Sequence, residues 1–284
     1  MRRIAIVGGT SALARSLIPA LREGNEVVTL GLGECDIHCD LLDPPEAIRI
    51  PADTAAVVHV AAAFGGPTDD DALRTVETNV VGTLKVCMAA KQADVRHLIV
   101  VSSIFAQLPE CSPWRGVYSI TKRQADELAA DYCRRHSLLL TVLRPSPLYG
   151  ADDDFRRHQP LLYRMADQAE KGEDLPIFGT RDALRNYIHA DDMARIVRGV
   201  LEQGCGGLYP CTFPRDVALS EVAAAAVEAF GGGGRVVFLK DKPDIPDNVF
   251  GHRLDLYEKI GFRPDVDIRE GMRRLARHRK AANR

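Results

Sequence analysis

The chain has 284 residues, of which 46% are hydrophobic and 27% are charged, a composition typical of a folded protein with a sizeable core. Its 37 Lys and Arg residues nearly balance its 39 Asp and Glu residues, so the formal net charge is only −2. This balance argues against nucleic acid or a membrane surface as the main partner. The locally basic stretch 273–284 is interpreted as a solvated helix or tail.

Neither a membrane span nor a metal site is expected. The chain holds no run of the roughly 18 uncharged apolar residues that a spanning helix needs. Its apolar start, Ile4–Val7, breaks at Gly8-Gly9 and is too short for a signal peptide. The seven cysteines form no C-x-x-C pair and complete no zinc site, so we expect reduced thiols, no metal and a cytoplasmic location.

The predicted elements alternate between strands and helices. The first strand, Ile4–Val7, is followed by a glycine-containing turn and an amphipathic helix. Later apolar runs predict buried strands at Val27–Leu30, Ala56–Val60, Leu98–Val101 and Leu139–Leu143. Helical periodicity lies between them, mainly over Leu73–Ala93 and Val117–His136. This alternation predicts an α/β fold with a Rossmann-type doubly wound parallel sheet, whose strands are buried on both faces.

After about residue 150 the pattern changes, because loop and turn signals such as Asp152–Asp154 and Gly231–Gly234 become frequent. We therefore predict two regions. Residues 1–150 form a dinucleotide-binding domain, and residues 151–284 form a smaller, less regular substrate-binding region. Part of the second region, at about 187–201, is expected to pack back on the first domain.

The turn after the first strand is a candidate phosphate site. It reads Gly8-Gly9-Thr10-Ser11-Ala12-Leu13-Ala14. At such a turn, backbone N–H groups and the helix N-terminus can face a pyrophosphate. The usual spacing places glycines at positions 8, 11 and 14, but here Ser11 and Ala14 stand in for the second and third. A plain tight turn is therefore the alternative.

The end of the second predicted strand often decides between NAD and NADP. An acid there binds the ribose 2′-hydroxyl, whereas a basic residue accommodates the 2′-phosphate. Here Leu30-Gly31-Leu32-Gly33 offers neither. The cofactor is therefore NAD or NADP, and we expect discrimination within about tenfold. Asp40 and Leu41, in the next turn, are placed to contact the adenine.

Tyr118 and Lys122 are the most informative pair. A spacing of four puts the phenol and the ammonium on one helix face. A neighbouring cation favours the phenolate, so we expect Lys122 to lower the pKa of Tyr118 and make it a usable general acid or base. Ser103 lies 15 residues earlier, at the end of a buried strand, where parallel sheets form their ligand crevice. An exposed helix pair without a catalytic role is the alternative.

With these residues noted, the chain resembles the extended short-chain dehydrogenase/reductases of the NAD-dependent epimerase/dehydratase family over nearly its whole length. The motifs that carry the resemblance, in chain order, are Val58-His59-Val60-Ala61-Ala62, Asn79-Val80-Val81-Gly82-Thr83, Val101-Ser102-Ser103, the segment from Tyr118 to Lys122, Leu143-Arg144-Pro145, Leu148-Tyr149-Gly150, the segment from Arg185 to Asp192, Leu254-Asp255 and Ile260-Gly261-Phe262-Arg263-Pro264.

The resemblance implies roles for individual residues. Ser103 would polarise the substrate oxygen, Tyr118 would move the proton, and Lys122 would hold the nicotinamide ribose. Arg185 would bind a substrate phosphate, and Phe64 is expected to contact substrate together with Ser103. The expected cofactor contacts are Gly8, Thr10, Ser11, Ala12, Leu13, Asp40, Leu41, Ala61, Ala62, Ala63, Asn79, Tyr118, Lys122, Pro145 and Ser146.

Two departures from the family bear on the reaction. Ile104-Phe105 follow Ser103 where the family's dehydratases have Asp-Glu, which argues against elimination of water. Pro147 stands where nucleotide-sugar enzymes commonly have Asn, which removes one diphosphate contact.

The resemblance thus predicts an NAD(P)-dependent epimerase or keto-reductase that acts on a hydroxyl or keto carbon, with a nucleotide sugar as the expected substrate. It also implies a homodimer, formed through the helices at about 80–93 and 117–136. The alternative is a non-catalytic dinucleotide sensor or scaffold on the same fold.

Overall fold

The computed structural model describes residues 1–282, which divide into two compact units. Unit 1 consists of Met1–Pro145, Ala194–Cys211 and Asp255–Phe262; unit 2 consists of Ser146–Met193, Thr212–Leu254 and the residues from Arg263 onward. The predicted segment 187–201 is thus split, because its residues from Ala194 onward belong to unit 1. Residues 283 and 284, the end of the predicted substrate-binding region and of the basic stretch, lie outside the described part of the chain. Within residues 1–282, no helix has the length and apolar character needed to span a membrane.

Unit 1 is built on a seven-stranded parallel sheet in the order β11-β6-β5-β4-β1-β2-β3. The strands are β1 (Arg2–Val7), β2 (Asn25–Gly31), β3 (Ile37–His38), β4 (Thr54–His59), β5 (His97–Val101), β6 (Leu139–Pro145) and β11 (Gly207–Cys211). The predicted Rossmann-type class and its five strands are confirmed. The two further strands are both edges: β3 has only two residues, and β11 contains Pro210, which an edge strand tolerates.

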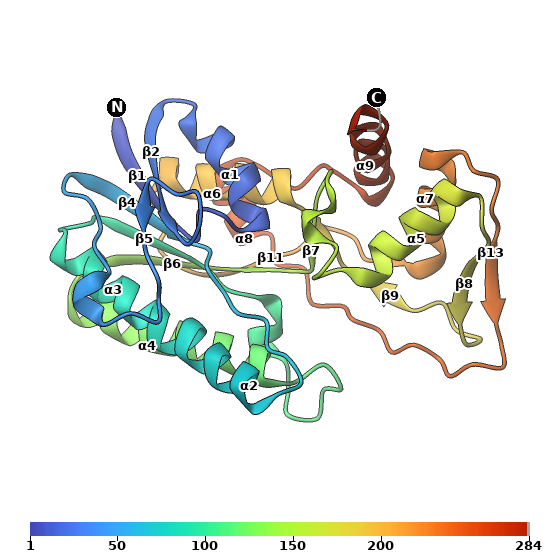
Figure 1. Ribbon diagram of the computed structural model, residues 1–284, viewed down its shortest axis with the longest axis horizontal. Helices are drawn as coiled ribbons and strands as arrows, with labels where there is room; N and C mark the ends of the chain where they lie inside the picture. Colours follow the sequence, from blue (N-terminus) through green and yellow to red (C-terminus); the bar gives the residue numbers. More distant parts are fainter. Residues whose placement is uncertain (283–284) are drawn as a thin grey trace. The chain divides into compact units, whose positions relative to one another are not determined.

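Helices cover both faces of this sheet (Figure 1). On one face lie α1 (Ala12–Arg22), α8 (Asp255–Ile260) and the part of α6 (Ala190–Gln203) that belongs to unit 1; on the other lie α2 (Asp69–Val76), α3 (Gly82–Gln92) and α4 (Val117–Arg135). Short 3₁₀ turns occur at Pro45–Ala47 and Ile104–Gln107. The core on the α3 and α4 side includes small buried side chains such as Cys87, Ala90 and Ala129, and small side chains let helices pack closely.

The prediction of a single helix over Leu73–Ala93 is wrong, because the helical segment begins earlier and is interrupted. The helix begins at Asp69, where Thr68 and Asp71 form a capping box. A π-helical turn over Glu77–Val81 then separates α2 from α3. Such turns are frequent at functional sites. Here the turn carries Asn79, whose side chain is buried in unit 1.

Unit 2 contains three two-stranded sheets. They pair β7 (Leu148–Tyr149) with β10 (Ile188–His189), β9 (Leu184–Arg185) with β12 (Val217–Ala218), and β8 (Leu175–Phe178) with β13 (Val236–Leu239). Its helices are a 3₁₀ turn at Asp153–Phe155, α5 (Pro160–Lys171), α7 (Leu219–Phe230) and α9 (Ile268–Ala282). Gly232 and Gly234 lie directly against backbone carbonyls of Ala169 and Glu173, so a side chain at either glycine would collide with the end of α5.

A buried guanidinium ties α9 into unit 2. Arg279 is 7% exposed and lies 2.8 Å from carboxylate oxygens of Asp153 and Glu170 and 3.0 Å from Asp167. The guanidinium of Arg156 also donates hydrogen bonds to both Asp153 and Asp167. The basic C-terminal stretch is therefore helical through Ala282, as expected, but Arg279 within it is buried rather than solvated.

We expect Arg279→Met to lower the free energy of unfolding at pH 7 by about 1–3 kcal/mol, less than for a fully buried pair because its partners are partly exposed. The hydrogen bond from Arg156 lowers the pKa of Asp167, and Arg279 adds to that shift. A carboxylate with a lowered native pKa stabilises the fold above its unfolded pKa, near 4, and this stability is lost as pH falls through the native pKa. Urea unfolding should therefore show a loss at pH 7 that shrinks toward pH 2. The exposed Arg277→Met is the control, and an equal loss at both pH values would contradict the ion-pair account.

Candidate active site

The structure brings Ser103, Tyr118 and Lys122 together at the carboxyl end of β5. Ser103 follows this strand and begins the Ile104–Gln107 turn, with its Oγ accepting a hydrogen bond from the N–H of Phe105 at 3.2 Å. The Ser103 hydroxyl lies close enough to the Tyr118 phenol to influence its pKa. Lys122, one helical turn beyond Tyr118 and 5% exposed, donates from Nζ to the carbonyl of Val101 at 3.1 Å. A proton-transferring phenol thus lies beside a hydroxyl donor and a buried ammonium.

Burial controls the ionisation of this cluster. It raises the pKa of Tyr118 to about 12, although the nearby Ser103 hydroxyl acts in the opposite direction. Burial also lowers the pKa of Lys122 to about 8. The pKa of Tyr118 is therefore raised, not lowered as the helical spacing suggested, because removal of the phenol from water opposes its charged form.

An aromatic stack covers one face of the Tyr118 ring. Phe64, in the loop after β4, lies with its ring centroid 5.0 Å from that of Tyr118, and the two planes are inclined by only 17°. The Phe64 side chain is 51% exposed. It therefore presents apolar surface beside the phenol, where a substrate contact was expected from the sequence.

Asn79 joins two parts of the candidate site. Its amide donates to the carbonyl of Ala63 and accepts from the N–H of the same residue, both at 2.8 Å. It also donates to the hydroxyl of Thr121 at 3.1 Å. The π-helical turn thus fixes the loop of Ala61, Ala62 and Ala63 relative to α4. Thr121 was not among the residues expected at the site, although it directly precedes Lys122.

The turn from β1 to α1 has the features of an anion site. Gly8 has φ +97°, and a Cβ there would lie 2.6 Å from the backbone nitrogen of Ala61, so only glycine fits. Ser11 caps α1, with its Oγ accepting from the N–H of Ala14 at 3.3 Å. Ala12 and Leu13 begin the helix, where amides have no intrahelical partner and favour negative charge. These residues fit the pyrophosphate of a dinucleotide, and they would hold it through backbone N–H groups.

The other predicted cofactor contacts in unit 1 lie in three separate segments of the chain. Thr10 belongs to the same turn, and Pro145 ends β6. Asp40 accepts a hydrogen bond from the N–H of Leu42 at 2.9 Å, so its carboxylate stabilises its own turn. Leu41 is buried in the core, where its side chain lies against Gly82. The adenine contact predicted for Asp40 and Leu41 stays a prediction.

Two predicted site residues belong to unit 2. Ser146 is buried, and within residues 1–282 its hydroxyl has no hydrogen-bond partner. Arg185 is also buried, and its guanidinium donates to the carbonyls of Leu184 and Pro246 at 2.7 and 2.9 Å. Burial lowers the pKa of this guanidinium. The cofactor and phosphate contacts expected from these residues stay predictions.

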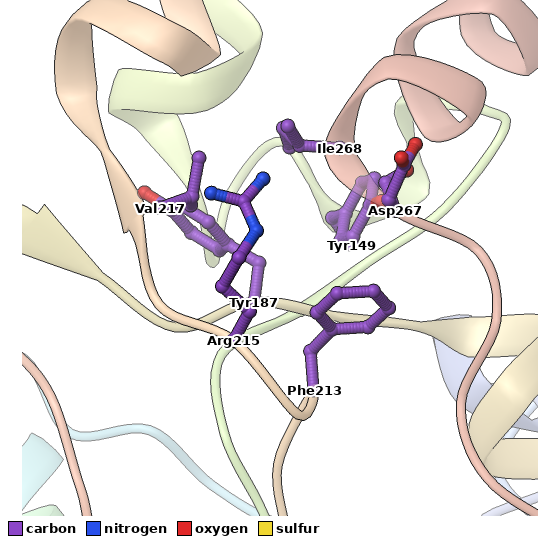
Figure 2. Close-up of a pocket in the computed structure, with 7 residues that line it drawn as sticks. All are labelled: Tyr149, Tyr187, Phe213, Arg215, Val217, Asp267 and Ile268. Carbon is purple, nitrogen blue, oxygen red and sulfur yellow. The ribbon is translucent and has the colours of Figure 1, made fainter.

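Unit 2 also contains a small hollow walled by aromatic rings (Figure 2). The Arg215 guanidinium points between the walls, and Asp267 lies at one side. The Tyr149 hydroxyl donates to the carbonyl of Asp267 at 3.1 Å. The lining residues are Tyr149, Tyr187, Phe213, Arg215, Val217, Asp267 and Ile268.

Two residues to which the sequence assigned no role at the site, Asp126 and Arg144, pair with each other next to the cluster of Ser103, Tyr118 and Lys122. Asp126, one turn beyond Lys122 on α4, accepts a hydrogen bond at 2.8 Å from Nε of Arg144 on β6. In the sequence, Asp126 could have been noticed because it lies four residues after Lys122, a spacing that puts both side chains on one face of a helix. Its pairing with Arg144 could not be anticipated, because it depends on how α4 packs on the sheet.

A wholly parallel sheet with a glycine turn at its first helix defines a Rossmann-type dinucleotide-binding protein. The chain belongs to the NAD dependent epimerase/dehydratase family, whose sequence model matches residues 4–210. The resemblance drawn from the motifs is thus confirmed, and the protein is an enzyme of that family. The residues at the end of β2 did not decide between NAD and NADP. The family to which the chain belongs is NAD-dependent.

Individual relatives carry out different reactions. The chain is 25% identical over 251 residues to dTDP-glucose 4,6-dehydratase of Streptomyces niveus, covering 83% of this chain and 73% of the relative. It is 26% identical over 216 residues to UDP-glucuronic acid decarboxylase 5 of Arabidopsis thaliana, covering 70% of this chain and 62% of the relative. The structure of Thermus thermophilus UDP-glucose 4-epimerase in complex with NAD superposes with a TM-score of 0.78 and 21% identity, covering 99% of both chains. That likeness shows the fold, and the relatives together do not single out one reaction.

Proposed function

We propose that this protein exchanges a hydride between NAD and a hydroxyl or keto carbon of a nucleotide sugar, in an epimerisation or a keto-sugar reduction. The observation that carries the proposal is the cluster of Ser103, Tyr118 and Lys122 at the end of β5. The substrate class is supported by the relatives, which are named for dTDP-glucose, UDP-glucuronic acid and UDP-glucose.

Each residue of the cluster has a distinct task. NAD, when bound, supplies the hydride acceptor or donor. Ser103 donates a hydrogen bond to the substrate oxygen and stabilises negative charge that develops there. Tyr118, with its pKa near 12, is protonated at neutral pH and gives its proton to a keto oxygen as general acid in the reductive direction. In the oxidative half of an epimerisation, its phenolate form would accept the proton of the sugar hydroxyl and return it when the keto group is reduced. The Lys122 ammonium provides positive charge behind the phenol.

A dehydratase is disfavoured by the residues after Ser103. Ile104 is buried in unit 1, and neither it nor Phe105 carries a group that can transfer a proton. Elimination of water from a sugar needs an acid and a base beyond the tyrosine. The 3₁₀ turn at this point therefore supports hydride exchange without elimination.

The proposal is tested by incubating the protein with NAD and a panel of UDP-, dTDP- and GDP-hexoses, and in parallel with NADH and the 4-keto derivatives of these sugars. Chromatography of the nucleotide sugars and absorbance of NADH give the two readouts. We expect one member of the panel to be converted to its epimer or to its reduced form. Tight NAD binding without turnover on the whole panel would instead favour the non-catalytic sensor.

We also propose a homodimer formed through the helices on the α2, α3 and α4 side of the sheet (Figure 1). Apolar side chains are exposed there, with Leu73 on α2, Val81 in the π-helical turn and Leu128 on α4. Burial of such side chains stabilises an interface. Light scattering at micromolar concentration should give twice the chain mass, and Leu128→Glu should shift it toward the monomer. Leu208→Glu, at a similarly exposed leucine on β11, is the control, and a wild-type monomer would contradict the proposal.

The end of β2 leads to a prediction on cofactor choice. The strand ends at Gly31, and the exposed Leu32 that follows neither repels nor attracts a 2′-phosphate. We expect the wild type to discriminate between NAD and NADP by no more than about tenfold, or 1.4 kcal/mol. Leu32→Arg should increase affinity for NADP, because a guanidinium pairs with phosphate. Calorimetric binding isotherms for NAD and NADP, on the wild type and on Leu32→Arg, measure these two effects. Leu42→Arg, at another exposed leucine, is the control. A wild-type preference above about a hundredfold would show that another residue binds the ribose.

A further inference from the structure

Asp126 is a buried acid for which the reaction outlined above has no task. Its side chain is 2% exposed and lies one helical turn beyond Lys122, on the stripe of α4 that also carries Tyr118. A carboxylate without a charged partner is rarely buried, because its removal from water costs several kcal/mol. The position of Asp126 therefore requires an explanation.

Arg144 holds the carboxylate in place. Arg144 on β6 donates from Nε to Oδ2 at 2.8 Å, and both side chains are largely buried. Burial raises the pKa of Asp126, while the positive charge and the hydrogen bond of Arg144 act to lower it. Within residues 1–282, the other carboxylate oxygen, Oδ1, and the buried hydroxyl of Ser102 have no hydrogen-bond partner, so the carboxylate is held through one oxygen by the ion pair that connects α4 with β6.

Asp126 also places a negative charge one helical turn from Lys122, in the same buried part of α4. Burial lowers the pKa of Lys122 to about 8, and the charge of Asp126 opposes this shift. The other groups around Lys122 do not share this effect. His59 on β4 is buried and uncharged at neutral pH, with its pKa lowered to about 3 by burial and by Lys122; Tyr118 is protonated, and Arg144 has the same sign as the lysine.

We propose that Asp126 is a positioning residue of the active site: held by Arg144 one helical turn beyond Lys122, its carboxylate keeps the Lys122 ammonium charged at the end of β5, behind Tyr118. Asp126 acts through Lys122 and touches neither substrate nor cofactor. The catalytic consequence rests on the function proposed above, whereas the charge coupling between Asp126 and Lys122 can be measured without any turnover.

The direct test is an NMR titration of the lysine side chains in protein labelled at lysine Cε, with the Lys122 signal assigned from Lys122→Arg. In the wild type we expect Lys122 to titrate near pH 8. In Asp126→Asn its midpoint should fall by about one pH unit or more, because a close opposite charge is lost. Asp126→Glu should restore most of the shift. Asp131→Asn, on the same helix but at an exposed carboxylate that pairs with Arg134, should leave Lys122 unchanged.

A second variant covers the case in which Asp126→Asn does not fold, since it leaves Arg144 buried without its partner. Asp126→Asn combined with Arg144→Met removes both charges and should still lower the Lys122 midpoint. An unchanged midpoint in a folded variant of either kind would overturn the proposal.

The pH dependence of turnover separates this inference from the proposed function. With a substrate found, the basic limb of the turnover profile should move to lower pH in Asp126→Asn by the shift seen for Lys122, with KM changed less than kcat. A moved NMR midpoint without turnover on any nucleotide sugar would remove the proposed function and leave the charge coupling in place. A lowered NMR midpoint of Lys122 together with an unchanged pH profile of turnover would overturn the catalytic part of the inference.

Discussion

Tyr118→Phe is expected to retain NAD binding and to lose at least about a hundredfold in turnover, the usual contribution of a positioned general acid or base. The substitution removes one oxygen and keeps the ring that stacks on Phe64, so the packing of the site should be preserved. With a pKa near 12, the Tyr118 hydroxyl holds its proton at neutral pH, and the variant loses the proton that the substrate oxygen would receive.

Tyr132→Phe is the matched control, because Tyr132 lies on the same helix and its hydroxyl has no place in the cluster. Steady-state turnover and NAD binding isotherms are to be compared for both variants. Ser103→Ala should lose activity more mildly, since it removes one hydrogen-bond donor to the substrate oxygen and leaves the proton donor in place. Near-normal turnover of Tyr118→Phe would remove the proposed mechanism.

Gly8→Ala is expected to weaken NAD binding by at least about tenfold, or 1.4 kcal/mol. The residue has φ +97°, and an added Cβ would lie 2.6 Å from the nitrogen of Ala61 and 2.8 Å from its Cα. The turn would have to move away from the β4 end, and the N–H groups at the start of α1 would move with it. A displaced turn no longer places these amides around a pyrophosphate.

Gly24→Ala separates this steric effect from backbone strain. Gly24 has φ +93°, nearly the same as Gly8, but nothing lies within 4 Å of an added Cβ. Both variants should therefore lose about 1 kcal/mol of folding stability from the unfavourable φ. Only Gly8→Ala should lose NAD affinity, measured by calorimetry at a temperature where both proteins are folded. Equal affinities in the two variants would show that the first turn does not bind the cofactor.

The sequence alone determined the fold class, and it also singled out Ser103, Tyr118 and Lys122, which the structure brings together. Both depend on local patterns: apolar runs of strand length alternate with helical periodicity, and a spacing of four places Tyr118 and Lys122 on one side of α4. The rule that parallel strands present their carboxyl ends at one edge then placed Ser103 beside them. Every step used residues that are close in sequence or a general property of parallel sheets.

The tertiary structure decided what depends on packing between distant segments. Pro210 and Gly207 interrupt the apolar alternation that would predict a strand at β11. The segment is a strand because it pairs with β6. Arg144 reaches Asp126 across 18 residues because α4 lies on β6. The pKa of Tyr118 is the clearest case. The spacing of four suggested a lowered value, but the raised value comes from desolvation by surrounding segments, and burial is a property that spacing along one helix does not contain.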